Sequence, residues 1–398
     1  MIEIYTASVD GTFRSKWGKG VEKTKCIVHS VESRIVKDFK SDANGEYYTI
    51  DKYGNKIYAS PDEEMDLLKD MPDNYKYDAG PYLKSIKYAN EKVLEHPNAI
   101  FILDVPKTKA NEISRFYGVI CQPLEEMSIT LLKHKFQNNI SQANSIKSWQ
   151  DCLKTGGGRK LSTVMPANSL IIIDRYLFTG GGRKRMPQDE AIIRKEIEHG
   201  IDNIRDILKC LIPCHFKGIF NLLIMFEPKS ILERPDWNVP EEKQTYYQHF
   251  NDLCNRIAED LKTMFKKTFP RKRINLELLG VAYLDQSPEY YYETHDRRIL
   301  SNYYIIRATK AFKAFKNQSV ADSQDVFFDA LCSVGLTRST FESHLPYNSH
   351  QQVVNAISRH LENSKQYNLP NLLYKEGRWS RYNNLKYLTN PILDNLCK

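Results

Sequence analysis

The chain has 398 residues, of which 41% are hydrophobic and 27% charged, values typical of a globular protein and unlike those of disordered or fibrous chains. No apolar run reaches the roughly 18 residues that a membrane span requires, and the start of the chain lacks the basic and apolar segments of a secretory signal. Lysine and arginine exceed aspartate and glutamate by 57 to 49, a mild excess that permits contact with nucleic acid without requiring it. We therefore expect a cytoplasmic protein with no membrane partner.

Cysteine usage argues against a disulfide framework and against a metal site. The eight cysteines are scattered over the whole chain, and reduced, mostly buried thiols fit this spacing better than disulfides. The closest grouping, Cys210-x3-Cys214-His215, is not followed by a second pair of ligands at the spacing of a zinc site. We therefore expect no metal and no cofactor.

The first part of the chain, residues 1–153, is predicted to form an α+β domain. Asp104 follows an apolar strand, where α/β sheets place ligand-binding residues, although a turn residue is the simpler interpretation. Alternating or apolar runs predict strands at 2–8, 24–30 and 99–104, and Gly54-Asn55 predicts a hairpin joining strands at 46–50 and 56–59. Helices are predicted at 60–70, 81–95, 107–115, 124–136 and 142–153.

Residues 154–318 are predicted to form an α/β core with a parallel β-α-β-α-β arrangement. Its first strand is the apolar run at 169–178, which is typical of a central strand covered on both faces. Strands at 220–226 and 274–283 then alternate with helices at 188–211 and 241–267. Such alternation predicts parallel strands joined by right-handed crossovers.

Two identical hexapeptides, Thr-Gly-Gly-Gly-Arg-Lys, occupy 155–160 and 179–184 on either side of that first strand. Exposed glycine amides beside cationic side chains form a nest for a phosphate group, although neither copy matches a nucleotide-binding signature. Mobile connectors are the alternative, because three glycines lose much backbone entropy on ordering. Further basic clusters at 266–267 and 271–273 fit a solvated face equally well. The candidates for contact with phosphate or nucleic acid are Arg159, Lys160, Arg183, Lys184 and Arg185.

The last part of the chain, residues 319–398, is predicted to be a helical C-terminal region, with its clearest helices at 323–334 and 349–367. After Pro370 aromatic side chains such as Trp379 alternate with lysine and arginine. This pattern suits base stacking combined with phosphate contact. It suits the packing of a C-terminal extension equally well.

The densest polar chemistry lies in the segment Glu293-Thr294-His295-Asp296-Arg297-Arg298-Ile299-Leu300-Ser301-Asn302. His295, Arg297 and Asn302 have the spacing H-x-R-x4-N, which is that of the H-x-K-x4-D motif of phospholipase-D-like phosphodiesterases. Phosphodiester chemistry of this kind needs a nucleophilic imidazole and a cation for the phosphate oxygens. If the chain is catalytic, these three residues are the candidate catalytic groups. Arg297 binds phosphate bidentately but is not a neutral replacement for lysine, and Asn302 lacks the charge of a carboxylate.

The same segment resembles the His-Asp-Arg signature of the catalytically degenerate phospholipase-D-like domain that follows MIT modules. It is also similar to related bacterial proteins, several of them linked to antiviral defence. In that group an acidic residue ends an upstream strand, and Asp174-Arg175-Tyr176 looks similar. The resemblance covers about residues 165–318, and the chain lacks the glycine-rich turn expected after the motif. It implies a phospholipase-D-like core that binds more readily than it catalyses. Arg298 joins the phosphate-binding candidates, and the supporting residues are Asp174, Arg175, Glu293 and Asp296.

Three functions follow as hypotheses. The first is a nucleic-acid- or partner-binding component of a bacterial system, built on a catalytically degenerate core, for which the resemblance implies a context of antiviral defence. The second is a metal-independent nuclease or phosphodiesterase that uses two copies of His295 across a homodimer, because a second motif is not found within the chain. The third is an accessory subunit with protein partners only. A purely structural role for His-Asp-Arg, as a salt-bridged pin at the start of a strand, is the alternative to all three.

Overall fold

The structure of the protein is a computed structural model. Contacts within the chain divide it into two compact units, Met1–Ile129 with Val334–Phe341, and Thr130–Ser333 with Glu342–Lys398. The residues that the structure describes are 3–6, 27–30, 40–41, 47–50, 56–58, 100–103, 107–123, 135–155, 157–178, 190–216, 218–226, 236, 238–281, 297–330, 371–375, 378–381 and 389–394.

The first unit contains a four-stranded sheet in the order β2-β1-β6-β7, in which all neighbouring strands run parallel. A helix, α6, joins β6 to β7, and Ser114 Oγ of this helix accepts a hydrogen bond from the amide of Cys121 at 2.9 Å. A separate antiparallel sheet has the order β3-β4-β5. The bounds are β1 Glu3–Thr6, β2 Ile27–Ser30, β3 Lys40–Ser41, β4 Tyr47–Ile50, β5 Lys56–Tyr58, β6 Ile100–Leu103, α6 Lys107–Tyr117 and β7 Ile120–Pro123.

Most predictions that fall on described residues of this unit are confirmed. β1, β2 and β6 lie within the predicted strands at 2–8, 24–30 and 99–104, and β4 pairs with β5 as the predicted hairpin. The predicted helix at 107–115 is α6. Asp104 and the helices predicted at 60–70 and 81–95 lie outside the described residues.

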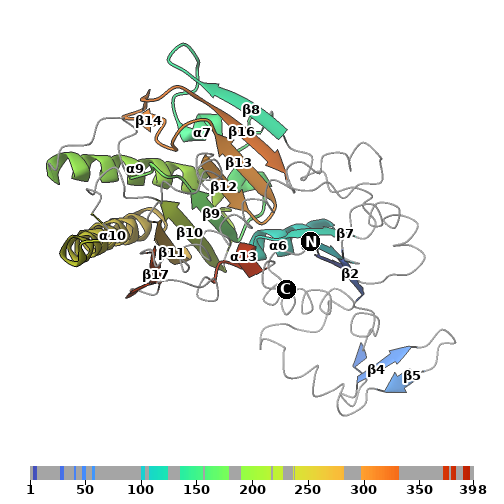
Figure 1. Ribbon diagram of the computed structural model, residues 1–398. Helices are drawn as coiled ribbons and strands as arrows, with labels where there is room; N and C mark the ends of the chain where they lie inside the picture. Colours follow the sequence, from blue (N-terminus) through green and yellow to red (C-terminus); the bar gives the residue numbers. More distant parts are fainter. Residues whose placement is uncertain are drawn as a thin grey trace. The chain divides into compact units, whose positions relative to one another are not determined.

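The second unit is built on a nine-stranded mixed sheet in the order β18-β17-β11-β10-β9-β12-β13-β16-β8 (Figure 1). Its described strands pair in parallel at β11-β10 and β10-β9 and antiparallel elsewhere. The strands are β8 Lys135–Ile140, β9 Ser169–Ile173, β10 Ile219–Phe226, β11 Arg273–Val281, β12 Arg297–Ser301, β13 Tyr304–Ala308, β16 Gln324–Ala330, β17 Asn371–Lys375 and β18 Arg378–Arg381. The other elements are α7 Trp149–Cys152, α8 Leu161–Val164, α9 Glu190–Leu211, α10 Pro240–Thr268, α13 Pro391–Asp394 and the two-stranded sheet of β14 Phe315–Lys316 and β15 Ser319–Val320.

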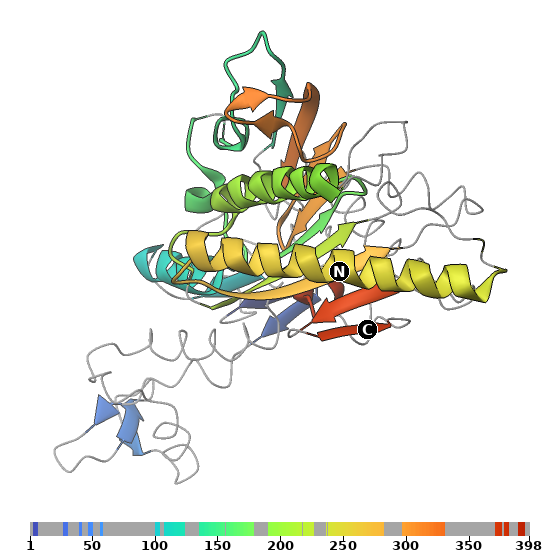
Figure 2. The same cartoon turned by 90° about the vertical axis from the view of Figure 1, so that its left-hand side faces the viewer.

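The parallel part of this sheet has the predicted β-α-β-α-β order. β9, α9, β10, α10 and β11 follow one another along the chain, and Leu223 in β10 lies opposite Ile171 of β9 and Glu277 of β11. α9 and α10 lie side by side on one face of the sheet (Figure 2). The parallel core is therefore confirmed at the level of a mixed α/β sheet.

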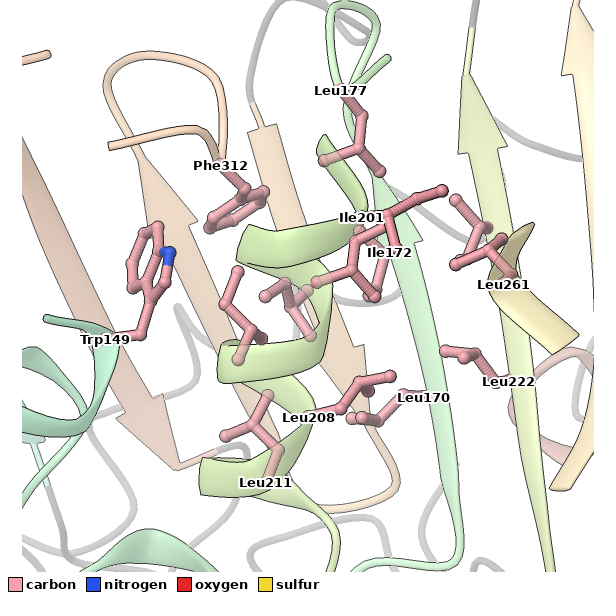
Figure 3. Close-up of a cluster of buried hydrophobic side chains, with 14 of the residues drawn as sticks. Trp149, Leu170, Ile172, Leu177, Ile201, Leu208, Leu211, Leu222, Leu261 and Phe312 are labelled. Atoms are coloured by element: carbon pink, nitrogen blue, oxygen red, sulfur yellow. The ribbon is translucent and has the colours of Figure 1, made fainter. Parts of the chain in front are cut away.

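A single apolar core lies between the sheet and these helices. Figure 3 shows Leu170 and Ile172 of β9 on one side of α9, and Trp149 and Phe312 on the other. Trp149 donates through Nε1 to Asn203 Oδ1 at 2.8 Å, so the polar edge of this buried indole is satisfied. Buried aromatic and branched side chains of this kind each contribute about 1.5–3 kcal/mol to folding.

The opposite face of the sheet is buried as well. Ile171, Leu223 and Leu300, which point away from the helices, are all 0% exposed. Because both faces are covered, β9 needs apolar side chains at every position. This explains why the run at 169–173 shows no alternation in the sequence.

The structure corrects the predicted helical character of the C-terminal region. Residues 324–330, assigned to a helix at 323–334, form β16 between β13 and β8. Its burial alternates, with Gln324, Val326 and Phe328 buried and Phe327 only half-buried, as expected of a strand. Residues 371–375 and 378–381 also form strands rather than helices. The helix predicted at 349–367 lies outside the described residues.

Of the two helices predicted just before the core, the first is wrong where the structure describes it, and the second is shorter than predicted. Residues 135–140, which include the end of the helix predicted at 124–136, form the edge strand β8. The segment at 142–153 contains a helix only at 149–152, where Ser148 Oγ caps the first turn by accepting from the amide of Asp151. The sequence of β8 does not look like a strand because most of its residues are polar, and an edge strand needs few apolar side chains. None of the described helices has an apolar stretch long enough to cross a membrane.

Candidate functional site

The carboxyl end of β9 and the start of β12 lie side by side, at the side of the central sheet where the parallel strands end (Figure 1). Ile173, the last residue of β9, lies opposite Arg298 in the antiparallel ladder. Asp174 and Arg297, the next residues outward on the two strands, are therefore neighbours. We name Asp174, Arg175, Tyr176 and Arg297 the carboxyl-edge site, because they lie at the carboxyl end of β9.

Asp174 is a buried carboxyl group held by two backbone amides. It is 0% exposed, and it accepts hydrogen bonds from the amide of Phe312 at 2.6 Å and from the amide of Tyr176 at 2.9 Å. Burial raises the pKa of Asp174 to about 6, against the opposing effect of these amides and of the positive charges of Arg297 and Lys313. A carboxyl group with a pKa this close to neutrality, at a strand end, is a common feature of functional sites.

Two arginine side chains lie near the ring of Tyr176. The guanidinium carbon of Arg297 lies 5.4 Å from the centre of the Tyr176 ring, and that of Arg175 lies 5.5 Å from it, distances at which a cation is attracted to the face of a ring. Arg175 is only 7% exposed. Arg297 is half-buried, and its described hydrogen bond is a long one, from Nη1 to the carbonyl oxygen of Thr309 at 3.4 Å.

Polar side chains of α9 hold the loop that follows β13 through an ion pair and hydrogen bonds. Lys313, 8% exposed, forms an ion pair with Glu196. His199 Nε2 is hydrogen-bonded to the carbonyl oxygen of Phe315 at 2.9 Å, and burial lowers the pKa of His199. Asn203 also donates to the Phe315 carbonyl, at 2.9 Å. The sequence contained no motif that pointed to Lys313 or Glu196, since they come together only through the packing of α9.

The structure places Asn302 at the other end of β12 from Arg297. Asn302 Oδ1 accepts from the amides of Asn168 and Ser169 at 3.2 and 3.1 Å, and its Nδ2 donates to Asn168 Oδ1. The intervening strand separates Arg297 from Asn302 by about 16 Å at 3.3 Å per residue. The H-x-R-x4-N spacing therefore does not gather its arginine and asparagine into one site, and Asn302 joins the start of β9 to the β12-β13 turn.

Arg298 points to the other face of the sheet from Arg297. Neighbouring residues of a strand alternate between faces, and Ile299, on the face of Arg297, packs in the helical core. Arg298 instead shares its face with Leu300 and lies opposite Arg307 of β13. It therefore lies outside the carboxyl-edge site.

Arg159 and Lys160 lie at the amino edge of the parallel strands. They precede α8, whose Ser162 accepts through its carbonyl oxygen from the amide of Cys214, just after α9 ends. The end of α9 lies at the amino end of β10, so the length of β9 separates this loop from Asp174. The first hexapeptide is a closed loop with hydrogen bonds from Gly158 N to Thr155 O and from Thr155 N to Arg159 O. Gly158 has a φ of 74°, which a glycine adopts without strain.

Several predicted site residues lie outside the described part of the chain. They are Arg183, Lys184, Arg185, Glu293, His295 and Asp296. The carboxyl-edge site is therefore described through its strand-end residues and not through the motif histidine.

No three His, Cys, Asp or Glu side chains come together as a metal site among the residues with described positions. Within the Cys210-x3-Cys214-His215 grouping, Cys210 is buried and Cys214 and His215 are exposed.

Comparison of the chain with protein-family models, with curated proteins and with solved structures gives no match.

Proposed function

We propose that the carboxyl-edge site binds a phosphate group of nucleic acid, and that the chain is a nucleic-acid-binding component built on a catalytically degenerate phospholipase-D-like core. The observation that carries this proposal is the position of Arg297, over the ring of Tyr176 and next to the buried Asp174. The resemblance to defence-linked bacterial proteins supplies the biological context of the proposal.

Arg297 suits the recognition of an oxyanion. Its guanidinium makes no ion pair at salt-bridge distance with a described carboxylate, and its hydrogen bond to Thr309 is long. The cation–π contact with Tyr176 restricts the Arg297 side chain, so less rotamer freedom is lost when a phosphate binds. Charge-assisted hydrogen bonds from such a fork contribute about 1.5–3 kcal/mol.

The position of Asn302 favours binding over catalysis. A phosphodiesterase of the phospholipase-D type needs the groups of its motif near one phosphorus atom, whereas Asn302 is used in the Asn168 network at the far end of β12. Arg297 and the turn after β9 remain as a binding surface without it.

The test measures the affinity of the full chain for a short single-stranded oligonucleotide by fluorescence anisotropy. Arg297→Ala is expected to weaken binding at least about tenfold, in line with the loss of one charge-assisted contact. Arg194→Ala is the matched control, since Arg194 is an exposed arginine on α9 paired with Glu198 at 3.1 Å. Equal affinities for the two variants would overturn the proposal. If neither single- nor double-stranded nucleic acid binds, the accessory subunit with protein partners becomes the better hypothesis.

A metal-independent phosphodiesterase is the second candidate. The observation that favours it is a carboxyl group, Asp174, that can exchange a proton near neutral pH beside Arg297, which follows His295 by two residues. Such an enzyme would cleave single- or double-stranded DNA or RNA in the presence of EDTA, and His295→Ala would abolish the cleavage. Unchanged substrate at stoichiometric protein concentration excludes it.

A further inference from the structure

We propose that the amino edge of the parallel strands is a second, sequence-independent docking surface for the phosphate backbone of a nucleic acid duplex. This inference goes beyond the carboxyl-edge site, which lies at the other end of β9. The surface, named the basic edge, is formed by exposed side chains from three separate segments: Arg159, Lys160, His215, Lys266, Lys267, Arg271 and Arg273.

The three segments are tied to one another at this edge. Arg273 at the start of β11 lies opposite Ile219 at the start of β10. Lys272 donates through Nζ to the carbonyl oxygens of Pro213, Cys214 and Phe216 at 3.1, 2.8 and 2.6 Å. The amide of Cys214 in turn donates to the Ser162 carbonyl at 3.3 Å, which links this turn to α8 and the Arg159 loop. The cations are therefore carried on braced turns and helix ends.

The cations of the basic edge form no ion pair with a carboxylate in the part of the chain that the structure describes. Asp151 in α7 and Asp206 in α9 pair with other cations, namely Lys154 for Asp151 and Arg205 and Lys209 for Asp206. Like charges held together without counterions repel one another and raise the local potential, which a polyanion relieves.

The composition of the surface selects a phosphate backbone over a lipid surface. Stable insertion into a bilayer needs bulky apolar side chains, whereas Ile219, 52% exposed, is the large apolar side chain exposed at this edge in the described structure. Three of the cations, Arg159, Arg271 and Arg273, have the fork that pairs with phosphate oxygens. Among the described residues of this surface no aromatic ring is exposed for base stacking, so the contact is with the backbone and independent of base sequence.

The dimensions of the edge suit several phosphates at once. Two strand spacings separate β9 from β11, about 10 Å, which exceeds the separation of two successive phosphates on one strand of a duplex. Gly157 and Gly158 have no heavy atom closer than 4.0 Å to where a Cβ would stand, so a phosphate can approach the backbone of the Arg159 loop. The basic edge can therefore contact at least two successive phosphates.

The test compares two variants of the full chain that each lose the same number of charges. The edge variant carries Lys266→Gln, Lys267→Gln, Arg271→Gln and Arg273→Gln, and the control variant carries Arg194→Gln, Lys195→Gln, Lys243→Gln and Lys316→Gln. Binding of a random-sequence DNA duplex and of the matching RNA duplex is measured from about 50 to 250 mM salt. Both variants are first compared with the natural chain by thermal unfolding.

The edge variant is expected to lose at least about tenfold in affinity for the duplexes. Its slope of log affinity against log salt is expected to fall by about 0.9 for each lost phosphate contact, and so by at most about 3.6 for the four cations. The control variant keeps most of the slope. Equal salt slopes for the two variants would overturn the inference. It would also be overturned if the edge variant lost binding to anionic vesicles but kept its affinity for the duplexes.

A further arm separates this inference from the function proposed above. Arg297→Ala is expected to leave the salt slope for the duplex unchanged, even where it weakens binding of the single-stranded oligonucleotide. If Arg297→Ala removes duplex binding as fully as the edge variant does, the basic edge is not a separate surface and the inference fails. If Arg297→Ala has no effect on either ligand while the edge variant does, the carboxyl-edge proposal fails and the basic edge stands.

Discussion

The two edges of the parallel sheet use cationic side chains in opposite ways. At the carboxyl edge Arg175 and Lys313 are less than a tenth exposed, and a buried carboxyl group and an aromatic ring surround them. At the basic edge Arg159, Arg271 and Arg273 are exposed and make no described ion pair. Lysine and arginine are therefore held in a fixed local arrangement at the carboxyl edge, whereas at the basic edge they create a positive potential over a wider surface.

The free-energy cost of a cationic side chain differs between the two edges, because it depends on burial. A buried cation loses its hydration and stays charged only where nearby acceptors or opposite charges compensate for that loss. Small changes in packing can therefore disturb the carboxyl edge. An exposed cation costs little and contributes little to folding, so the basic edge can lose charges without unfolding. Stability should depend on the first edge, and salt-dependent binding on the second.

The largest stability effect is expected for Gly200→Ala. A Cβ at Gly200 in α9 would lie 2.2 Å from the carbonyl oxygen of Leu177 and 3.0 Å from Phe178 Cδ1, in the turn that follows Asp174. We expect a loss of about 3 kcal/mol from overpacking, even though alanine favours a helix. Urea unfolding followed by circular dichroism measures it.

The matched control at the basic edge is Gly157→Ala, whose Cβ would have only Thr155 Oγ1 within 4.0 Å. We expect a change within about 0.5 kcal/mol for this exposed position. A Gly200→Ala protein as stable as Gly157→Ala would show that the turn after Asp174 is not held by α9.

The second effect is a pH dependence that belongs to the carboxyl edge. Because the pKa of Asp174 is raised from 3.8 to about 6, its contribution to stability is fully present below the unfolded pKa and is lost as the pH rises through about 6. The loss amounts to about 3 kcal/mol at about 1.4 kcal/mol per pKa unit. Urea unfolding of the natural chain and of Asp174→Asn between pH 4 and 7 measures it as a difference.

The difference between the two proteins isolates Asp174 from His199. The lowered pKa of His199 acts in the other direction, because its contribution to stability is present above the unfolded pKa and lost as the pH falls. It is the same in both proteins and cancels in the difference. A difference that stays constant from pH 4 to 7 would contradict the burial of an ionisable carboxyl group at this edge.

The smallest of the three effects concerns the brace of the basic edge. Lys272→Met removes the donor to the carbonyl oxygens of Pro213, Cys214 and Phe216 and should cost about 2 kcal/mol. Lys209→Met, which removes a surface ion pair with Asp206, should cost less than 1 kcal/mol. Thermal unfolding of both variants ranks them, and equal midpoints would mean that Lys272 does not brace the turns.

The predictions from sequence succeeded where local pattern and burial agree. The strands at 169–173 and 219–226 and the helices at 190–211 and 240–268 carry strong periodic or apolar patterns. β16 was missed because Gln324 and Asp325 gave it polar positions that also fit a helix, and β8 because an edge strand can be polar. Both are strands through pairing with residues far away in the chain, which no local window contains.

The candidate site was predictable only in part, for the same reason. Asp174 was singled out as an acidic strand end and Arg297 as a motif residue, and the antiparallel pairing of β12 with β9 brings them together. The motif spacing also suggested that Asn302 belongs with Arg297, but a strand extends residues about 3.3 Å apart. Lys313 and Glu196 could not be found, since their pairing depends on how α9 packs on the loop after β13.

The sequence by itself determined the α/β class, the order of the parallel core and the presence of basic clusters, because these depend on periodicity and composition. The tertiary structure alone decided which charges meet. It placed Arg297 beside Asp174 and placed Asn302 at the far end of the same strand. It also brought Arg159, Lys266 and Arg273 to a single edge, because parallel strands joined by helices align all their amino ends on one side.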